Sequence, residues 1–98
     1  MSKIKFNNGT AIGISAFNRY IRYEDNKAVN SLSIRLENVA DEELIEPLLA
    51  DHSITGYTLM DDEGEIIYNK TGLDGHVTSV NETMQSTGEL LVEVYATF

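Results

Sequence analysis

The sequence predicts a mostly β protein of the α+β type: an antiparallel β-sandwich or roll of about eight strands in hairpins, with one short helix near residues 41–51. Apolar and polar side chains alternate along most of the chain, which is the pattern of strands with one buried face. Glycine, asparagine and other turn residues separate the alternating runs, as in hairpins. Only residues 39–51 carry apolar side chains at the three- to four-residue spacing of a helix.

The length and composition are those of one compact unit. With 98 residues and 42% hydrophobic content, we expect a single domain over residues 1–98 with one core. The chain has no cysteine, so packing and strand pairing alone must hold the fold. No apolar stretch approaches the roughly 20 residues that span a bilayer, and the alternating N-terminus is unlike a signal peptide. We therefore expect a protein that is cytoplasmic when synthesised and has no membrane partner.

The part of the chain before residue 38 predicts two hairpins. Asn8-Gly9 marks the first turn, because Asn-Gly between two alternating runs is a strong hairpin signal. Gly13, inside the second run, indicates a bulge or a close approach of another backbone. A polar turn at residues 24–27 closes the second hairpin. The four predicted strands cover residues 3–6, 10–15, 17–23 and 31–36.

The predicted helix covers residues 39–51 and contains a proline. Asn38 or Asp41 can cap its N-terminus, since both side chains accept hydrogen bonds from backbone N–H groups. Pro47 removes a backbone donor, at a cost of about 3 kcal/mol in a regular helix interior. We therefore expect two short turns with a break between them, whose apolar stripe covers one end or one face of the sheet.

Residues 53–73 give the clearest hairpin signal, because Gly64 can take the positive φ that closes its short loop. The loop at residues 85–88 ends in glycine and predicts a last hairpin. The four strands of this half cover residues 54–60, 65–69, 77–84 and 89–98. Strand alternation and helix spacing together predict a core drawn from Phe6, Ile12, Ile14, Leu32, Ile34, Leu36, Leu44, Leu48, Leu59, Ile66, Val92 and Val94.

The net charge of −9 is unevenly distributed. Residues 1–35 hold six of the seven basic residues, whereas residues 36–69 hold ten acids and no Lys or Arg. An acidic surface repels phosphate backbones, so we expect no nucleic-acid partner. The acids suit a basic protein partner, or they simply keep a small domain in solution.

The sequence contains no catalytic or cofactor motif such as a Gly-x-Ser-x-Gly elbow, a phosphate loop or a dinucleotide fingerprint. His52 and His76 have no second His or Cys at ligand spacing, and we interpret both as loop residues. The acidic run at residues 61–65 has Leu59 where an EF-hand needs an oxygen ligand, so we interpret it as a solvated loop tip. We expect a protein that is not an enzyme and binds no cofactor or metal.

Residues 19–23 interleave arginine and tyrosine, the residue types most enriched in protein interfaces. The alternative interpretation is a sheet strand whose arginines pair with nearby acids. We identify this run and the acidic tip of the 53–73 hairpin as the candidate protein interface. Its residues are Arg19, Tyr20, Arg22, Tyr23, Asp61, Asp62 and Glu63.

Three segments carry a resemblance to a known group of proteins. They are the opening Ile4-Lys5-Phe6-Asn7-Asn8-Gly9-Thr10, the short acidic helix Asp41-Glu42-Glu43-Leu44-Ile45, and Ile54-Thr55-Gly56-Tyr57-Thr58-Leu59 with Asp61, Gly64 and Ile66. In this layout the chain resembles short, largely uncharacterised proteins encoded in the structural regions of tailed phages and prophages of Gram-positive bacteria. The resemblance does not extend to the run that begins at Val77, and it carries no catalytic residues.

The resemblance implies a virion or assembly protein that acts through protein–protein contacts and forms a homo-oligomer, so that the virion would be its final location. The alternative is an acidic phage-encoded inhibitor that binds a basic groove of a host defence protein. In the first case, the arginine–tyrosine run would face the acidic segment 41–51, or the tip at residues 61–65, of a neighbouring copy. An assembly protein should form a defined oligomer, whereas binding by an inhibitor should weaken steeply with salt.

Overall fold

Seven antiparallel strands pair in the order β5–β4–β1–β2–β3–β7–β6 in the computed structural model, which describes residues 2–7, 9–46 and 54–98. One short 3-10 helix, η1, joins them in this part of the chain. The mostly β, antiparallel fold with one short helix is therefore confirmed. The elements are β1 (Lys3–Phe6), β2 (Ile12–Glu24), β3 (Lys27–Leu36), η1 (Val39–Leu44), β4 (Tyr57–Met60), β5 (Ile66–Lys70), β6 (His76–Met84) and β7 (Leu90–Thr97).

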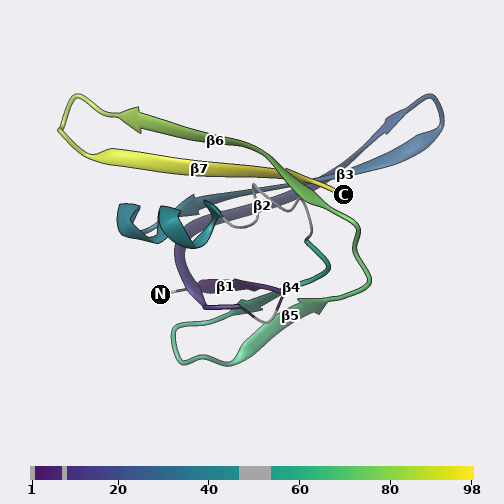
Figure 1. Ribbon diagram of the computed structural model, residues 1–98, viewed down its shortest axis with the longest axis horizontal. Helices are drawn as coiled ribbons and strands as arrows, with labels where there is room; N and C mark the ends of the chain where they lie inside the picture. Colours follow the sequence, from purple (N-terminus) through teal and green to yellow (C-terminus); the bar gives the residue numbers. More distant parts are fainter. Residues whose placement is uncertain (1, 8, 47–53) are drawn as a thin grey trace.

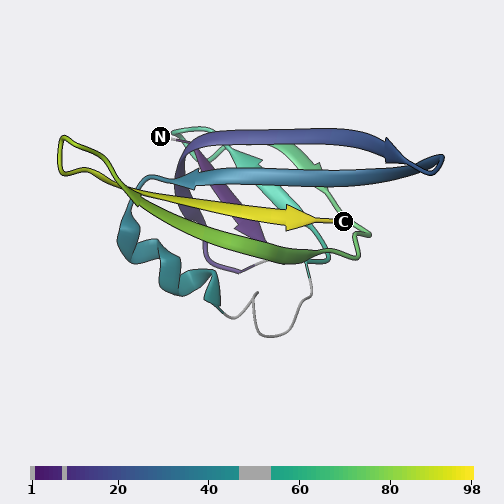
Figure 2. The ribbon, with the colours of Figure 1, turned by 90° about the horizontal axis from the view of Figure 1, so that it is seen from above.

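The sheet folds into two layers along β2 (Figure 1). The start of β2 pairs with β1, at Ile4 opposite Ile12, and the rest of the strand pairs with β3. The register shifts between Ile14 and Ala16, where a bulge bends the strand. One layer contains β1, β4 and β5, and the other contains β2, β3, β7 and β6, whose strands cross those of the first layer at an angle (Figure 2).

The bulge explains why the described residues contain seven strands and not the predicted eight. The predicted strands at residues 10–15 and 17–23 are one continuous strand, because no turn residue separates them and the chain only bends. Gly13 is not the bulged residue. Its carbonyl accepts an ordinary inter-strand hydrogen bond from the Glu37 backbone N–H at 3.1 Å, and the atoms nearest to a Cβ at this position would belong to the Glu37 side chain, so the close backbone approach is not found either.

Three of the predicted turns have the expected backbone conformations, whereas Gly9 is not among the residues with a positive φ, so the tight turn predicted at Asn8-Gly9 is not confirmed. Asp25 and Asn26 form the two-residue turn between β2 and β3, with φ angles of 49° and 65°. A two-residue turn with positive φ at both positions has a backbone twist that is compatible with the right-handed twist of the flanking strands. Gly64 closes the β4–β5 turn with a φ of 83°, as predicted, and Gly88 closes the β6–β7 turn with a φ of 87°.

Most of the predicted core is buried between the layers. The confirmed residues are Phe6, Ile12, Ile14, Leu32, Ile34, Leu36, Val92 and Val94. Leu59 is partly buried and packs against them. The prediction was wrong for Leu44 and Ile66, which are 39% and 66% exposed, and Leu48 lies outside the described residues. The core also includes residues that the prediction missed: Ile4, Ile45, Ile54, Tyr57, Val77 and Ala96.

The helix differs from the prediction in type and position. It is a 3-10 helix over Val39–Leu44, and residues 47–51 of the predicted span lie outside the described residues. Asn38 caps it, since its Oδ1 accepts a hydrogen bond from the Ala40 N–H at 3.0 Å. The tight turn places Ile45, and not Leu44, in the core. No helix within the described residues is long and apolar enough to cross a bilayer.

Candidate functional site

The structure separates the four predicted interface residues of β2 onto two faces. Arg19 is paired opposite Leu32, which is only 1% exposed, so Arg19 and Tyr23 lie on the face toward the core. Tyr20 and Arg22 lie on the outer face of the same strand. Tyr23 is 75% exposed because the β2–β3 hairpin extends beyond the other layer (Figure 1). These residues do not form one patch.

The two arginines have different partners. Arg22 Nε lies 3.2 Å from Glu24 Oε1, and both side chains are more than half exposed, so this ion pair contributes little to stability. Arg19 instead donates hydrogen bonds to Asn30 Oδ1 at 3.3 Å and to the Tyr68 hydroxyl at 3.4 Å. The interpretation of arginines paired with nearby acids therefore holds for Arg22 but not for Arg19.

The acidic tip at Asp61, Asp62 and Glu63 is the turn between β4 and β5. Asp61 Oδ1 accepts hydrogen bonds from the backbone N–H groups of Glu63 and Glu65, both at 2.9 Å, so this carboxylate organises the turn. The tip lies at the opposite end of the molecule from the β2–β3 hairpin tip (Figure 1). The two parts of the predicted interface can therefore meet only between different copies of the chain.

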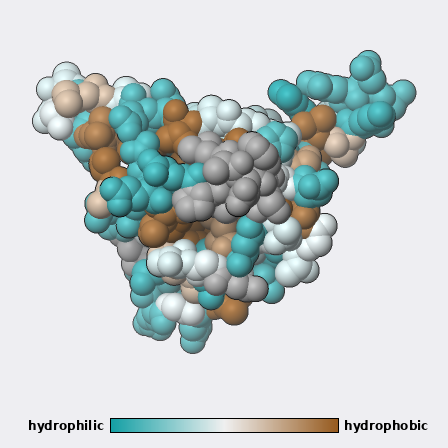
Figure 3. Space-filling model, in the orientation of Figure 1, coloured by the Kyte–Doolittle hydropathy of each residue, from teal (hydrophilic) through white to brown (hydrophobic). Residues whose placement is uncertain are grey.

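The edge strand β5 exposes three large apolar side chains that the sequence analysis did not place in the interface, and one of them, Ile66, was expected in the core. Ile66 is 66% exposed, Ile67 is 65% exposed and Tyr68 is 39% exposed. Figure 3 shows apolar surface at the foot of the molecule, where β5 begins, beside the hydrophilic β4–β5 turn. The signal in the sequence was the lack of alternation. A strand with one solvent-exposed face normally alternates apolar and polar residues, whereas three successive apolar residues make both faces apolar.

The other edge of the sheet, β6, is mostly polar. Apart from Met84 at its end, the exposed residues of β6 are His76, Thr78, Ser79, Asn81, Glu82 and Thr83. Among the described strands, β5 pairs only with β4, so its outer edge presents backbone N–H and C=O groups together with apolar side chains. Natural proteins usually cover or charge such an edge, because it can pair with another chain.

An aromatic cleft lies between the two layers, beside β5. Tyr57, at its centre, is 2% exposed, and its ring centroid lies 5.9 Å from that of Phe17 and 6.1 Å from that of Tyr68. Arg19 lines two hollows of this cleft, of about 460 Å³ and about 300 Å³. The first hollow lies toward Phe17 and Tyr68, and the second lies toward Phe98.

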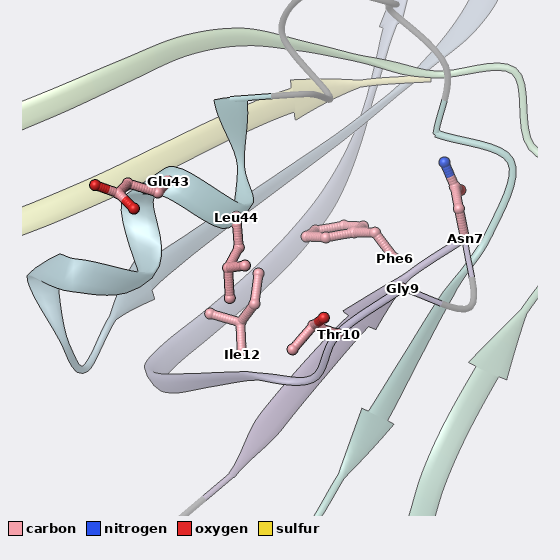
Figure 4. Close-up of a pocket in the computed structure, with 7 residues that line it drawn as sticks. All are labelled: Phe6, Asn7, Gly9, Thr10, Ile12, Glu43 and Leu44. Atoms are coloured by element: carbon pink, nitrogen blue, oxygen red, sulfur yellow. The ribbon is translucent and has the colours of Figure 1, made fainter.

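A further hollow of about 330 Å³ lies between η1 and the connection from β1 to β2 (Figure 4). Phe6, Ile12 and Leu44 point toward one another across it, whereas the Glu43 carboxylate points away. The described side chains that meet across this hollow are mostly apolar, so they offer few of the convergent polar groups that fix the orientation of a ligand.

The carboxyl groups of Glu42, on η1, and Glu82, on β6, lie close to each other. A hydrogen bond with Glu82 raises the pKa of the Glu42 carboxyl above its ordinary value of 4.5, and partial loss of hydration and the negative charges of Glu82 and Glu46 raise it further. Between pH 4.5 and the raised pKa, the folded protein therefore binds more protons than the unfolded chain. The free energy of unfolding consequently falls as the pH rises through this range.

A Glu42→Gln variant should therefore have a higher Tm than the parent at pH 7, because the amide hydrogen-bonds to Glu82 without a second negative charge. The difference should shrink as the pH is lowered toward 4.5, where the parent carboxyl takes up its proton. Thermal unfolding between pH 4 and pH 8 measures it. Glu43→Gln is the matched control, since it removes the same charge from the next residue. Equal gains for both variants would show that only net charge matters.

Within the described residues, no three His, Cys, Asp or Glu side chains are grouped in a way that could hold a metal ion. The chain matches no protein-family model and no curated protein sequence.

Proposed function

We propose that this chain is a non-enzymatic structural or assembly protein that acts through contacts with other protein chains, first of all with copies of itself. The observation that supports this proposal most directly is β5, an edge strand with Ile66, Ile67 and Tyr68 exposed. A place in a phage particle rests on the sequence resemblance alone.

In the proposed contact, β5 of one copy pairs antiparallel with β5 of a second copy. Such a pair is related by a two-fold axis, and each strand satisfies the free backbone groups of the other. Full burial of an isoleucine contributes roughly 1.5–3 kcal/mol, whereas an exposed ion pair contributes roughly 0.2–1 kcal/mol. The apolar side chains of β5 would therefore supply most of the association energy, more than a head-to-tail contact between Arg22 and the acidic tip.

The test is sedimentation velocity at tens of micromolar protein. The parent should form a defined oligomer, and Ile67→Lys should be a monomer, because a charge in the centre of the contact has no partner. The fold should survive, since Ile67 is 65% exposed. Met84→Lys is the control, because it makes the same kind of change at a 72% exposed position on the opposite edge and should sediment like the parent.

A strictly monomeric parent at tens of micromolar would overturn the self-association proposal. The acidic inhibitor would then be favoured, and one observation supports it: Glu42 and Glu82 are held together with Glu46 nearby, so one end of the molecule concentrates negative charge. Its binding to a basic protein groove should weaken steeply between low and physiological salt, whereas association through β5 should not.

A further inference from the structure

The Tyr57 hydroxyl is a buried polar group with no hydrogen-bond partner among the described residues. Tyr57 is 2% exposed, and three aromatic rings surround its own: those of Phe17, Tyr68 and Phe98, at centroid distances of 5.9, 6.1 and 6.2 Å. Nine in ten or more of buried polar groups in proteins are paired, so an unpaired hydroxyl in a well-packed core needs an explanation. A ligand that accepts its hydrogen bond would provide one.

Arg19 lines the same two hollows as Tyr57. Burial raises the pKa of the Tyr57 hydroxyl above its usual 10.0, and the positive charge of Arg19 acts against that change. Arg19 is held in place by its hydrogen bonds to Asn30 and Tyr68. Each of its terminal nitrogens carries a second N–H, and Nε carries another, so donors remain for a ligand.

The cleft is locally positive although the protein carries a net charge of −9. The described residues that line its two hollows include Arg19 and Lys70 and no Asp or Glu. On the outer face of the same sheet, by contrast, Arg35 pairs with Glu93 at 3.5 Å and the Tyr95 hydroxyl donates to Glu93 at 2.6 Å. These three groups of the outer face satisfy one another, whereas Arg19 and the Tyr57 hydroxyl in the cleft keep hydrogen-bond donors for a ligand.

We propose that this cleft binds a small carboxylic acid with a flat apolar body. The carboxylate would accept hydrogen bonds from Arg19 and from the Tyr57 hydroxyl, and the apolar body would pack against Phe17 and Tyr68. Arg19 presents its donors as a planar fork that matches a carboxylate. The hollows, at about 460 Å³ and about 300 Å³, are of the size that holds a small molecule. The polar groups of this site lie between the layers and not on the outer edge of β5, but Tyr68 belongs both to the cleft and to the proposed β5 contact, so the test must separate the two proposals.

The probe is phenylacetate, compared with 2-phenylethanol, which has the same ring but no charge. In a titration followed by amide and side-chain NMR shifts, phenylacetate should perturb the residues of the cleft. It should bind about tenfold or more tightly than the alcohol, because a hydrogen bond to a charged group is stronger than one to a neutral group. The titration should be repeated on Ile67→Lys, so that failure of this site and failure of self-association are distinguished.

Tyr57→Phe gives the sharpest result, because it should change stability and binding in opposite directions. Removing an unpaired buried hydroxyl should raise the Tm of the free protein by a few degrees. The same change should weaken phenylacetate binding about tenfold, and Arg19→Gln should weaken it at least as much. Tyr23→Phe, at a 75% exposed position, is the control and should change neither quantity.

Three outcomes would overturn the proposal. The first is a lower Tm for Tyr57→Phe, which would mean that the hydroxyl stabilises the free protein. The second is equal affinity for phenylacetate and 2-phenylethanol, which would show that the cleft recognises only the apolar ring. The third is the absence of shifts in the cleft with millimolar phenylacetate, in the parent and in Ile67→Lys alike.

Discussion

An Ile34→Asp variant is expected to lose cooperative unfolding, and Val92→Asp should do the same. Ile34 and Val92 are 2% and 1% exposed, and they lie on β3 and β7, the two middle strands of the layer formed by β2, β3, β7 and β6. Truncating a buried isoleucine costs about 2–5 kcal/mol, and a buried carboxylate without a partner costs several kcal/mol more. A domain of this size has a free energy of unfolding of only about 5–15 kcal/mol, so either change should leave the folded state unstable.

The measurement is a thermal melt followed by circular dichroism, which should show a broad loss of signal and no sigmoidal transition. Asn18→Asp is the control, because it places the same carboxylate on an exposed position of β2, opposite Ser33 on the outer face. It should melt close to the parent. If Ile34→Asp or Val92→Asp melts like the parent, the assignment of the buried face is wrong.

A Gly56→Ala variant should also be strongly destabilised, although it adds only one methyl group. A Cβ at position 56 would lie 2.7 Å from the backbone carbonyl oxygen of Lys70, which cannot move without shifting β5. Overpacking of this kind costs about 1–3 kcal/mol. Each kcal/mol lowers the Tm of a domain of this size by roughly 4–8 °C.

Gly13→Ala is the matched control for that substitution. Its Cβ would meet Glu37 Oε2 at 3.0 Å, but this atom is the end of a flexible side chain that can swing away. We expect a much smaller fall in Tm for Gly13→Ala than for Gly56→Ala. Equal losses would indicate that general loss of glycine flexibility, and not the contact with Lys70, decides the effect.

The residues on the two faces of the central strands could be predicted because the pattern is local. Successive side chains in a strand point to opposite faces, so Leu32, Ile34 and Leu36 share one face whatever lies beyond them. Turn conformations can be predicted for the same reason. The positive φ of Gly64 follows from the absence of a Cβ, a property of that residue alone.

The errors concern properties that depend on distant parts of the chain. Ile66 is an apolar residue of a predicted hairpin strand and was expected in the core, but β5 is the last strand of its layer and nothing in the described structure covers it. Ile45 and Leu44 are neighbours in sequence, and only the position of η1 against β2, β3 and β7 decides which of them is buried. The two strands predicted at residues 10–15 and 17–23 form the single strand β2, because the layer with β1 has to connect with the layer with β3 through a bend.

The cleft shows the same division between local and distant information. A run of arginine and tyrosine marked β2 as unusual, but Asn30 and Tyr68, the partners of Arg19, lie 11 and 49 residues away along the chain. Tyr57 has the sequence pattern of an ordinary strand residue. Only the fold surrounds its ring with three others and leaves its hydroxyl without a partner among the described residues. No spacing rule in the sequence brings these groups together.

The sequence by itself determined the antiparallel β class, the hairpin turns and the inward face of the central strands, since these follow from side-chain period and backbone preference within a few residues. Only the tertiary structure decided the order of the strands, which edge of the sheet remains apolar and where the Tyr57 hydroxyl lies relative to Arg19. These features arise from contacts between segments that are distant in sequence. Their positions are fixed only when the two layers pack together.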